Sequence, residues 1–75
     1  MPRRPKKRAD LEAIGGRIRE LRGDISQDVF APTIGITQSQ LSKIERGMLA
    51  PSVEVLLRLQ KRFKKSTDWI LMGEE

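Results

Sequence analysis

The segment between Thr37 and Gly47 carries polar side chains at a spacing that could do chemistry. On a helix of 3.6 residues per turn, with Gln38 set at zero, its amide, hydroxyl and cationic groups fall within one arc of about 140°. The members of this polar arc are Gln38, Ser39, Ser42, Lys43 and Arg46. Leu41 and Ile44 fall on the opposite side, at about 300° and 240°. Groups of this kind can reach base edges in the major groove of DNA, and phosphates.

The polar arc contains no acidic residue, although an ordinary solvated helix face mixes glutamate with lysine. An ordinary polar surface is nevertheless the alternative interpretation of the arc viewed alone. The hypothesis of nucleic-acid binding therefore depends also on where positive charge lies in the rest of the chain.

The excess positive charge lies in the first eight residues, MPRRPKKR. The chain has 15 Lys and Arg against 10 Asp and Glu, and with five cations in this segment the remaining residues balance. Because Pro2 and Pro5 disfavour helix, we expect residues 1–9 to form a flexible basic arm, followed by one domain over residues 10–75. The cations of the arm are Arg3, Arg4, Lys6, Lys7 and Arg8. They could grip DNA phosphates or the minor groove, or the arm could be a solubilising tail.

The composition argues against an enzyme. The 75 residues include no Cys and no His, which removes the thiol nucleophile, the commonest general base and the commonest metal ligands. We therefore expect no catalytic residue, no metal site and no cofactor. No apolar run is long enough to span a bilayer, and the basic residues lead into Ala9–Glu12 instead of the apolar region of a signal peptide. We expect a soluble, cytoplasmic and nucleoid-associated protein.

Apolar spacing predicts a first helix from about Leu11 to Arg22, capped by Asp10. Its apolar residues recur at steps of three and four, at Leu11, Ile14, Ile18 and Leu21. Gly15 and Gly16 oppose this helix, because each costs about 1 kcal/mol relative to alanine.

A short second helix is predicted to follow, with Ser26 as its N-cap. Its inward residues are Phe30, Ala31 and Ile34. Pro32 would remove a hydrogen bond from the helix interior, at a cost of up to about 3 kcal/mol. This helix is therefore either kinked at Pro32 or short.

The third helix, over residues 38–46, carries the polar arc. Gly35 ends the helix before it, Thr37 is its expected N-cap, and Gly47 lies where a C′ glycine would end it.

Two further helices are predicted. Ser52 can cap a fourth helix, whose inward stripe consists of Leu56, Leu59 and Phe63. Cations crowd its last turn, at Lys61, Arg62, Lys64 and Lys65. They suit the negative end of the helix dipole, and a nucleic-acid patch is the alternative. Ser66 or Thr67 can cap a last short helix, in which we expect Trp69 to anchor the core, not to serve as a ligand platform.

From about Ile14 to Gly73 the chain resembles the phage repressor and Cro type of helix-turn-helix domain, the lambda-repressor-like or XRE family. The matching strings are IGGRIRELR, SQDVFA, IGITQSQLSKIERG, APSVEVL and STDWILMG, in family order and nearly at family spacing. The resemblance implies an all-α fold, a compact bundle of five short helices. It also implies that the third helix enters the major groove of double-stranded DNA.

The resemblance implies a role for individual residues. The implied base readers are Gln38, Ser39, Ser42 and Lys43. The implied phosphate contacts are Gln27, Thr37 and Arg46. By its chemistry the Gln38 amide suits adenine, and the Lys43 ammonium suits guanine. In this family Glu45 would also pair with Arg22 in a structural ion pair.

Three features depart from the family pattern. The connection over residues 22–27 is two residues shorter than in the best-known members. Pro32 stands where a good helix former is usual. Met48–Ala50 replaces a loop that is often basic, so that any phosphate contact there must come from backbone N–H groups.

The sequence therefore predicts a sequence-specific DNA-binding transcriptional regulator of prokaryotic or phage type, more specifically a repressor. A single domain of this size buries little DNA surface, so we expect a homodimer on a palindromic operator. The candidate dimer surfaces are Trp69–Met72 and the segment after Met48. The alternatives are an antitoxin-like or controller protein whose main partner is another protein, and a pure protein-interaction module.

Overall fold

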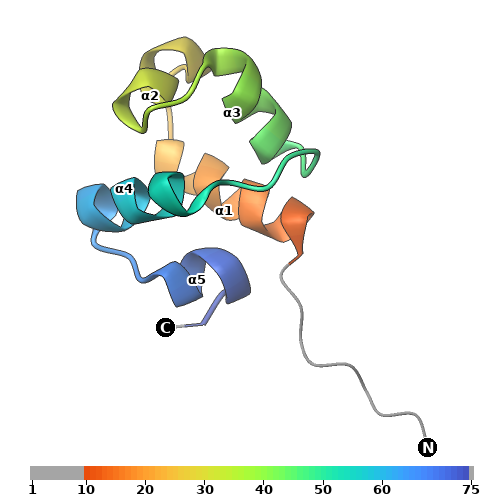
Figure 1. Cartoon of the computed structure of the whole chain (residues 1–75), viewed down its shortest axis with the longest axis vertical. Coiled ribbons are helices and arrows are strands. Elements are labelled where there is room, and N and C mark those ends of the chain that lie inside the picture. Colours follow the sequence, from red (N-terminus) through yellow and green to blue (C-terminus); the bar gives the residue numbers. More distant parts are fainter. Residues whose placement is uncertain (1–9, 75) are drawn as a thin grey trace, which may run out of the picture.

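The computed structural model describes residues 10–74, and the predicted basic arm lies outside them. These residues form five helices and no strand, which confirms the predicted all-α fold (Figure 1). The helices are α1 (Leu11–Arg22), α2 (Gln27–Thr33), α3 (Gln38–Glu45), α4 (Val53–Phe63) and α5 (Thr67–Met72). None of the helices between residues 10 and 74 could span a bilayer.

Local capping determines where most of these helices begin. Asp10 accepts the backbone N–H groups of Glu12 and Ala13 at 3.0 and 3.3 Å, and Thr37 forms a complete capping box with Gln40. Such caps satisfy amide groups that have no partner inside the helix. Ser52 and Ser66 cap α4 and α5 in the same way. Ser26 occupies the N-cap position of α2, but its side chain makes no capping hydrogen bond.

Pro32 is accommodated because α2 is short. It lies in the last turn of this seven-residue helix, which ends one residue later. The carbonyls of Ala31 and Pro32 then accept N–H groups from residues 34–36 as the chain turns. Of the two predicted alternatives, a kink at Pro32 or a short helix, the structure shows the short helix.

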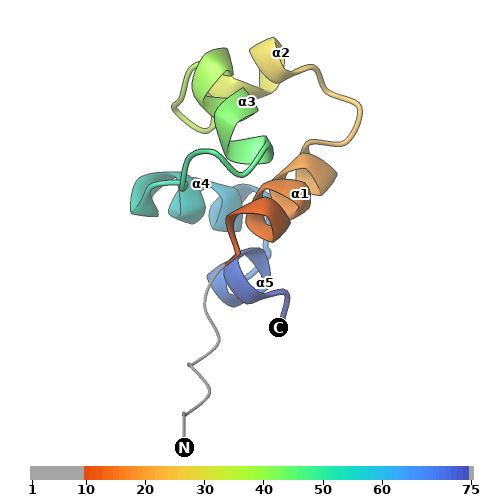
Figure 2. The same ribbon diagram turned by 90° about the vertical axis from the view of Figure 1, so that its right-hand side faces the viewer.

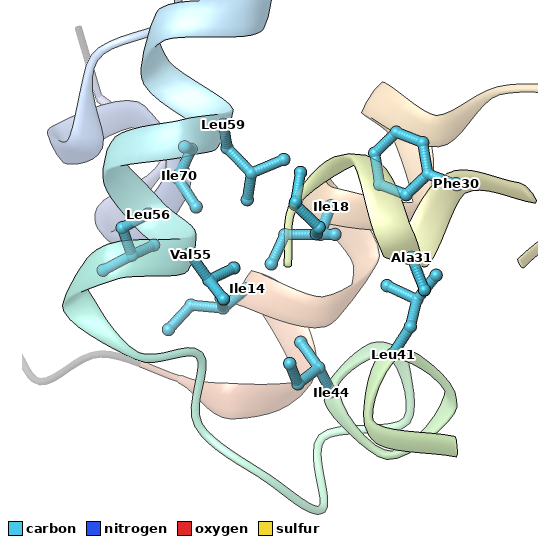
Figure 3. Packing of buried hydrophobic residues seen from close by; sticks show 11 residues of the cluster. Ile14, Ile18, Phe30, Ala31, Leu41, Ile44, Val55, Leu56, Leu59 and Ile70 are labelled. Carbon is cyan, nitrogen blue, oxygen red and sulfur yellow. The ribbon is translucent and has the colours of Figure 1, made fainter. Parts of the chain in front are cut away.

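The core lies where α1, α3 and α4 converge, with α2 and α5 closing its two ends (Figure 3). Its buried residues are Ile14, Ile18, Phe30, Ala31, Ile34, Leu41, Ile44, Val55, Leu56, Leu59 and Ile70. The predicted inward positions of Leu41 and Ile44 are confirmed. One expectation needs correction, because Leu11 is exposed and the buried face of α1 begins at Ile14. Trp69 is half-buried and packs against the core as predicted, and the fully buried residue of α5 is Ile70.

A side chain of α1 hydrogen-bonds the end of α5, in addition to the packing of Ile70 in the core. Arg17 donates from Nε to the carbonyl of Ile70 at 3.0 Å and from Nη2 to that of Leu71 at 3.3 Å. These carbonyls belong to the last turn of α5, where the helix has no N–H partner of its own for them.

Helices α1 and α3 approach so closely that a glycine is required between them. A Cβ atom on Gly15 would overlap the carbonyl oxygen of Ile44 and lie 2.7 Å from that of Glu45. Gly16, the next residue along α1, faces solvent and has nothing within 4 Å of its Cβ position. Two adjacent glycines of one helix therefore have opposite roles.

We expect Gly15→Ala to destabilise the domain by about 1 to 3 kcal/mol or more, because the added methyl must push two backbones apart. Gly16→Ala should stabilise it by about 1 kcal/mol through helix propensity. Urea unfolding followed by circular dichroism measures both values, and Gly16→Ala is the matched control. Equal effects of the two substitutions would contradict the close approach.

Candidate nucleic-acid interface

The exposed face of α3 is formed by the polar arc. Helices α2 and α3 lie together at one end of the molecule, and α5 lies at the other (Figures 1 and 2). Because Leu41 and Ile44 are buried, the opposite side of α3 is turned to solvent. Gln38, Ser39, Lys43 and Arg46 are exposed and Ser42 is half-buried. The structure thus brings all predicted base readers to one surface.

The charge of this surface is positive because its one acid points inward. Glu45 is the only acidic residue of α3, and its side chain is 4% exposed. Lys43 and Arg46 remain at the surface, and Arg46 lies along the helix with its Nε donating to the carbonyl of Ser42 at 3.3 Å. An anion approaching α3 therefore meets hydroxyls, amides and cations.

Arg22 and Glu45 form a bidentate ion pair between α1 and α3. Arg22 donates from Nε to Oε2 at 2.7 Å and from Nη2 to Oε1 at 2.9 Å. Its remaining nitrogen, Nη1, donates to the carbonyl of Ile25 at 2.8 Å. The hydrogen bond to Glu45 raises the pKa of Arg22, burial opposes this, and the charge of Glu45 adds to it. Arg22 is therefore cationic at neutral pH and remains a donor to the carboxylate.

A chain of amide hydrogen bonds leads from this ion pair to the surface. Gln27, the first residue of α2, donates from Nε2 to Glu45 Oε1 at 2.9 Å. Its own Oε1 accepts Nε2 of Gln38 at 2.7 Å. The half-buried Gln27 thus bridges the two ends of α3. We call these three residues, Glu45, Gln27 and Gln38, the amide relay.

The amide relay was not predicted from the sequence. Gln27 was predicted to bind phosphate, whereas in the structure both the oxygen and one N–H of its amide are engaged within the protein. A signal was present, because Gln38 and Glu45 are seven residues apart and so only about 20° apart around a helix. The sequence, however, does not indicate which residue of another helix would lie between Gln38 and Glu45.

The N-terminus of α2 carries a negative charge next to Gln27. Asp28 is fully exposed, and its pKa is lowered, mainly by the side-chain hydrogen bond with Ser26 and further by backbone hydrogen bonds. The carboxylate is therefore ionised at neutral pH and opposes the approach of a phosphate.

Thr37 and Gln40 are occupied by the cap of α3. The Thr37 hydroxyl accepts the backbone N–H of Gln40 at 3.1 Å, and Gln40 Oε1 accepts the backbone N–H of Thr37 at 2.9 Å. Of the two residues, Thr37 was predicted to contact phosphate, and its hydroxyl would have to do so while it holds this cap.

The remaining predicted surfaces differ in exposure. Trp69 and Leu71 pack against the core, so only part of Trp69–Met72 is free. The segment after Met48 and the adjoining face of α4 are more exposed, with the apolar side chains of Met48, Leu49, Val53 and Leu57. At the end of α4, Arg62 lies 5.7 and 5.4 Å from the ring centres of Phe30 and Phe63 and so covers the core.

Comparison with known proteins places this geometry in a family. The helix-turn-helix family model matches residues 17–70. The chain therefore belongs to the helix-turn-helix family of the phage-repressor, XRE type, as the resemblance implied. It is a DNA-binding transcriptional regulator. Among curated proteins no sequence matches it.

The solved structures that are similar to the chain include two of the P22 c2 repressor and one controller protein. The P22 c2 repressor in complex with the synthetic operator 9T has 33% identity and a TM-score of 0.73, over 81% of this chain and 96% of that one. The solution structure of the P22 c2 DNA-binding domain has 32% identity and a TM-score of 0.70, over 84% and 86%. The restriction-modification controller protein C.AhdI from Aeromonas hydrophila has 30% identity and a TM-score of 0.69, over 83% and 93%.

We expect Glu45→Ala to lower the free energy of unfolding by about 3 to 5 kcal/mol, because Arg22 would be left partly buried without its partner. Glu54→Ala is the matched control. It removes an exposed ion pair with Arg58 of similar length, 2.8 Å, and should cost at most about 0.5 kcal/mol. Urea unfolding of the three proteins tests this, and a Glu45→Ala protein as stable as the Glu54→Ala control would show that the pair is not structural.

Proposed function

We propose that this protein is a repressor that reads the major groove with the helix over residues 38–46. The proposal rests on the acid-free polar arc on the exposed face of α3, whose backbone is fixed by Leu41 and Ile44 in the core. A helix of this kind fits the major groove, where each base pair presents a distinct pattern of donors and acceptors. The similarity to a repressor in complex with its operator supports the proposal.

In this proposal Gln38, Ser39, Ser42 and Lys43 read base edges. The Gln38 amide, which both donates and accepts, suits adenine, and the Lys43 ammonium suits the two acceptors of guanine. Arg46 contacts phosphate, with Thr37 and Gln27 as further phosphate contacts. For Gln27 only the second N–H of its amide can bind phosphate, because the first already binds Glu45. The nearby Asp28 carboxylate weakens this contact, because it repels phosphate.

The protein acts as a homodimer in this proposal, because one small domain covers too little DNA for tight operator binding. Two copies would read half-sites about 34 Å apart. The exposed apolar side chains around Met48 and Val53 are the better candidate for the dimer surface, because Ile70 and its neighbours in α5 are used in the core.

A controller-type or antitoxin-like function is the second candidate, with another protein as main partner and DNA binding used for autoregulation. The similarity to the controller protein C.AhdI favours it. Stable co-purification with a second, different chain from the native host would support this candidate over a repressor that acts alone.

Base reading is tested by Gln38→Ala and Lys43→Ala. Each should reduce the preference for selected operator duplexes over random duplexes by about 1 to 3 kcal/mol, while binding to random duplexes changes less. Lys61→Ala removes an exposed cation of α4 outside the polar arc and is the control. Sites selected from a random duplex pool supply the operator, and affinities are measured by fluorescence anisotropy. Equal losses on both kinds of duplex would refute base reading by these two residues.

The basic arm is tested through the salt dependence of DNA binding. Each neutralised phosphate contributes about −0.9 to the slope of log affinity against log salt, so deleting residues 1–8 should flatten the slope by up to about 4 units. Replacing the five arm cations by glutamine at unchanged length should do the same. An unchanged slope in both variants would mean that the arm is only a tail.

A further inference from the structure

The hydrogen bonds of the amide relay all run the same way: Gln38 donates to Gln27, and Gln27 donates to Glu45. This order is set by the Glu45 carboxylate, which can only accept hydrogen bonds. Both oxygens of Glu45 accept N–H groups from Arg22, and Oε1 also accepts Nε2 of Gln27 at 2.9 Å. An ionised carboxylate has no N–H or O–H to offer. Gln27 must therefore turn its NH₂ group toward Glu45 and its oxygen away from it.

This orientation decides how the next amide is turned. The oxygen of Gln27 lies 2.7 Å from Nε2 of Gln38, so Gln38 is the donor. One N–H of Gln38 is used in this bond, and one N–H and the side-chain oxygen remain for a ligand. The almost completely buried Glu45 carboxylate therefore determines the orientation of both amide groups, that is, which neighbour their NH₂ groups face.

The one donor and one acceptor that remain on Gln38 complement the major-groove edge of adenine but not that of guanine. Adenine presents the N7 acceptor and the N6 donor in the major groove, whereas guanine presents two acceptors, N7 and O6. If the relay ran in the opposite direction, Gln38 would accept from Gln27 and keep both N–H groups, which would match guanine. The direction of two hydrogen bonds thus selects between the bases.

We propose that Glu45 is a positioning residue that fixes the direction of the amide relay and thereby makes Gln38 select adenine over guanine. This inference rests on the proposed reading of the major groove by α3. It gives Glu45 a second role, apart from the stability that its pairing with Arg22 provides.

The deciding variant is Glu45→Gln, because an amide at this position can present either a donor or an acceptor to Gln27. A random duplex pool is selected with the unaltered protein, and the position that loses its preference in Gln38→Ala identifies the base that Gln38 contacts. At that position the unaltered protein should prefer adenine over guanine by roughly 5- to 150-fold. In Glu45→Gln this ratio should fall toward unity, while preferences at other positions and the salt slope are retained.

Arg22→Lys is the matched control, since it weakens the same buried pair but leaves Glu45 as an acceptor. It should lower stability and keep the preference for adenine. Equal loss of the preference in both variants would make the role of Glu45 merely structural and overturn the proposal. A pool from which the unaltered protein selects nothing would instead refute the proposed function, so the two failures are distinct.

A measurement on the free, unaltered protein keeps the inference testable even if Glu45→Gln does not fold. Scalar couplings across hydrogen bonds in NMR spectra identify donor and acceptor separately. We expect couplings from Gln38 Nε2 to the side-chain carbonyl carbon of Gln27, and from Gln27 Nε2 to the carboxyl carbon of Glu45. A coupling from Gln27 Nε2 to Gln38, or none between the two glutamines, would overturn the proposal.

Discussion

The Arg22 guanidinium and the Glu45 carboxylate form a nearly buried ion pair between the ends of α1 and α3. Buried charges are tolerated only when their hydrogen-bonding groups are satisfied. Here the guanidinium binds both carboxylate oxygens and the carbonyl of Ile25, and the carboxylate takes one further N–H from Gln27. These bonds connect the end of α1, the loop that follows it, the start of α2 and the end of α3. The ion pair therefore ties three helices together at one point, beside the hydrophobic core that packs them.

Two glycines make this placement possible. At Gly15 the backbones of α1 and α3 approach within a distance that no side chain allows, and at Gly47 a Cβ would lie 2.7 Å from the Cγ of Glu12. Gly47 also has a φ of 77°, which residues with a Cβ rarely adopt. The helix propensity lost at Gly15 is thus offset by a tertiary contact, whereas the loss at the solvent-exposed Gly16 has no such compensation.

How much could be predicted from the sequence depends on the range of the interaction concerned. Helices α1, α3, α4 and α5 follow from apolar periodicity and from caps such as Asp10 and Thr37, which act within three residues along the chain. The exposure of the polar arc follows in the same way. The amide relay could not be predicted, because it depends on how α2 lies against α3. The connection that precedes α2 is itself held by a side chain, because Arg22 donates to the carbonyl of Ile25. Local sequence patterns do not encode such a tertiary arrangement.

The relay also changes which polar residues of the interface are free to bind. The sequence does not distinguish these polar side chains, but the structure divides them into those engaged in hydrogen bonds within the protein and those exposed to solvent. Gln40 is used to cap α3, and Gln27 is used to hold Gln38. Ser39 and Lys43, in contrast, are exposed on the same face. A side chain that is already oriented loses less conformational entropy on binding than a free one. Gln38 combines a fixed orientation with exposure. In the proposed reading of the major groove, this makes it the residue of α3 best suited to discriminate between bases, while Lys43 contributes charge and reach.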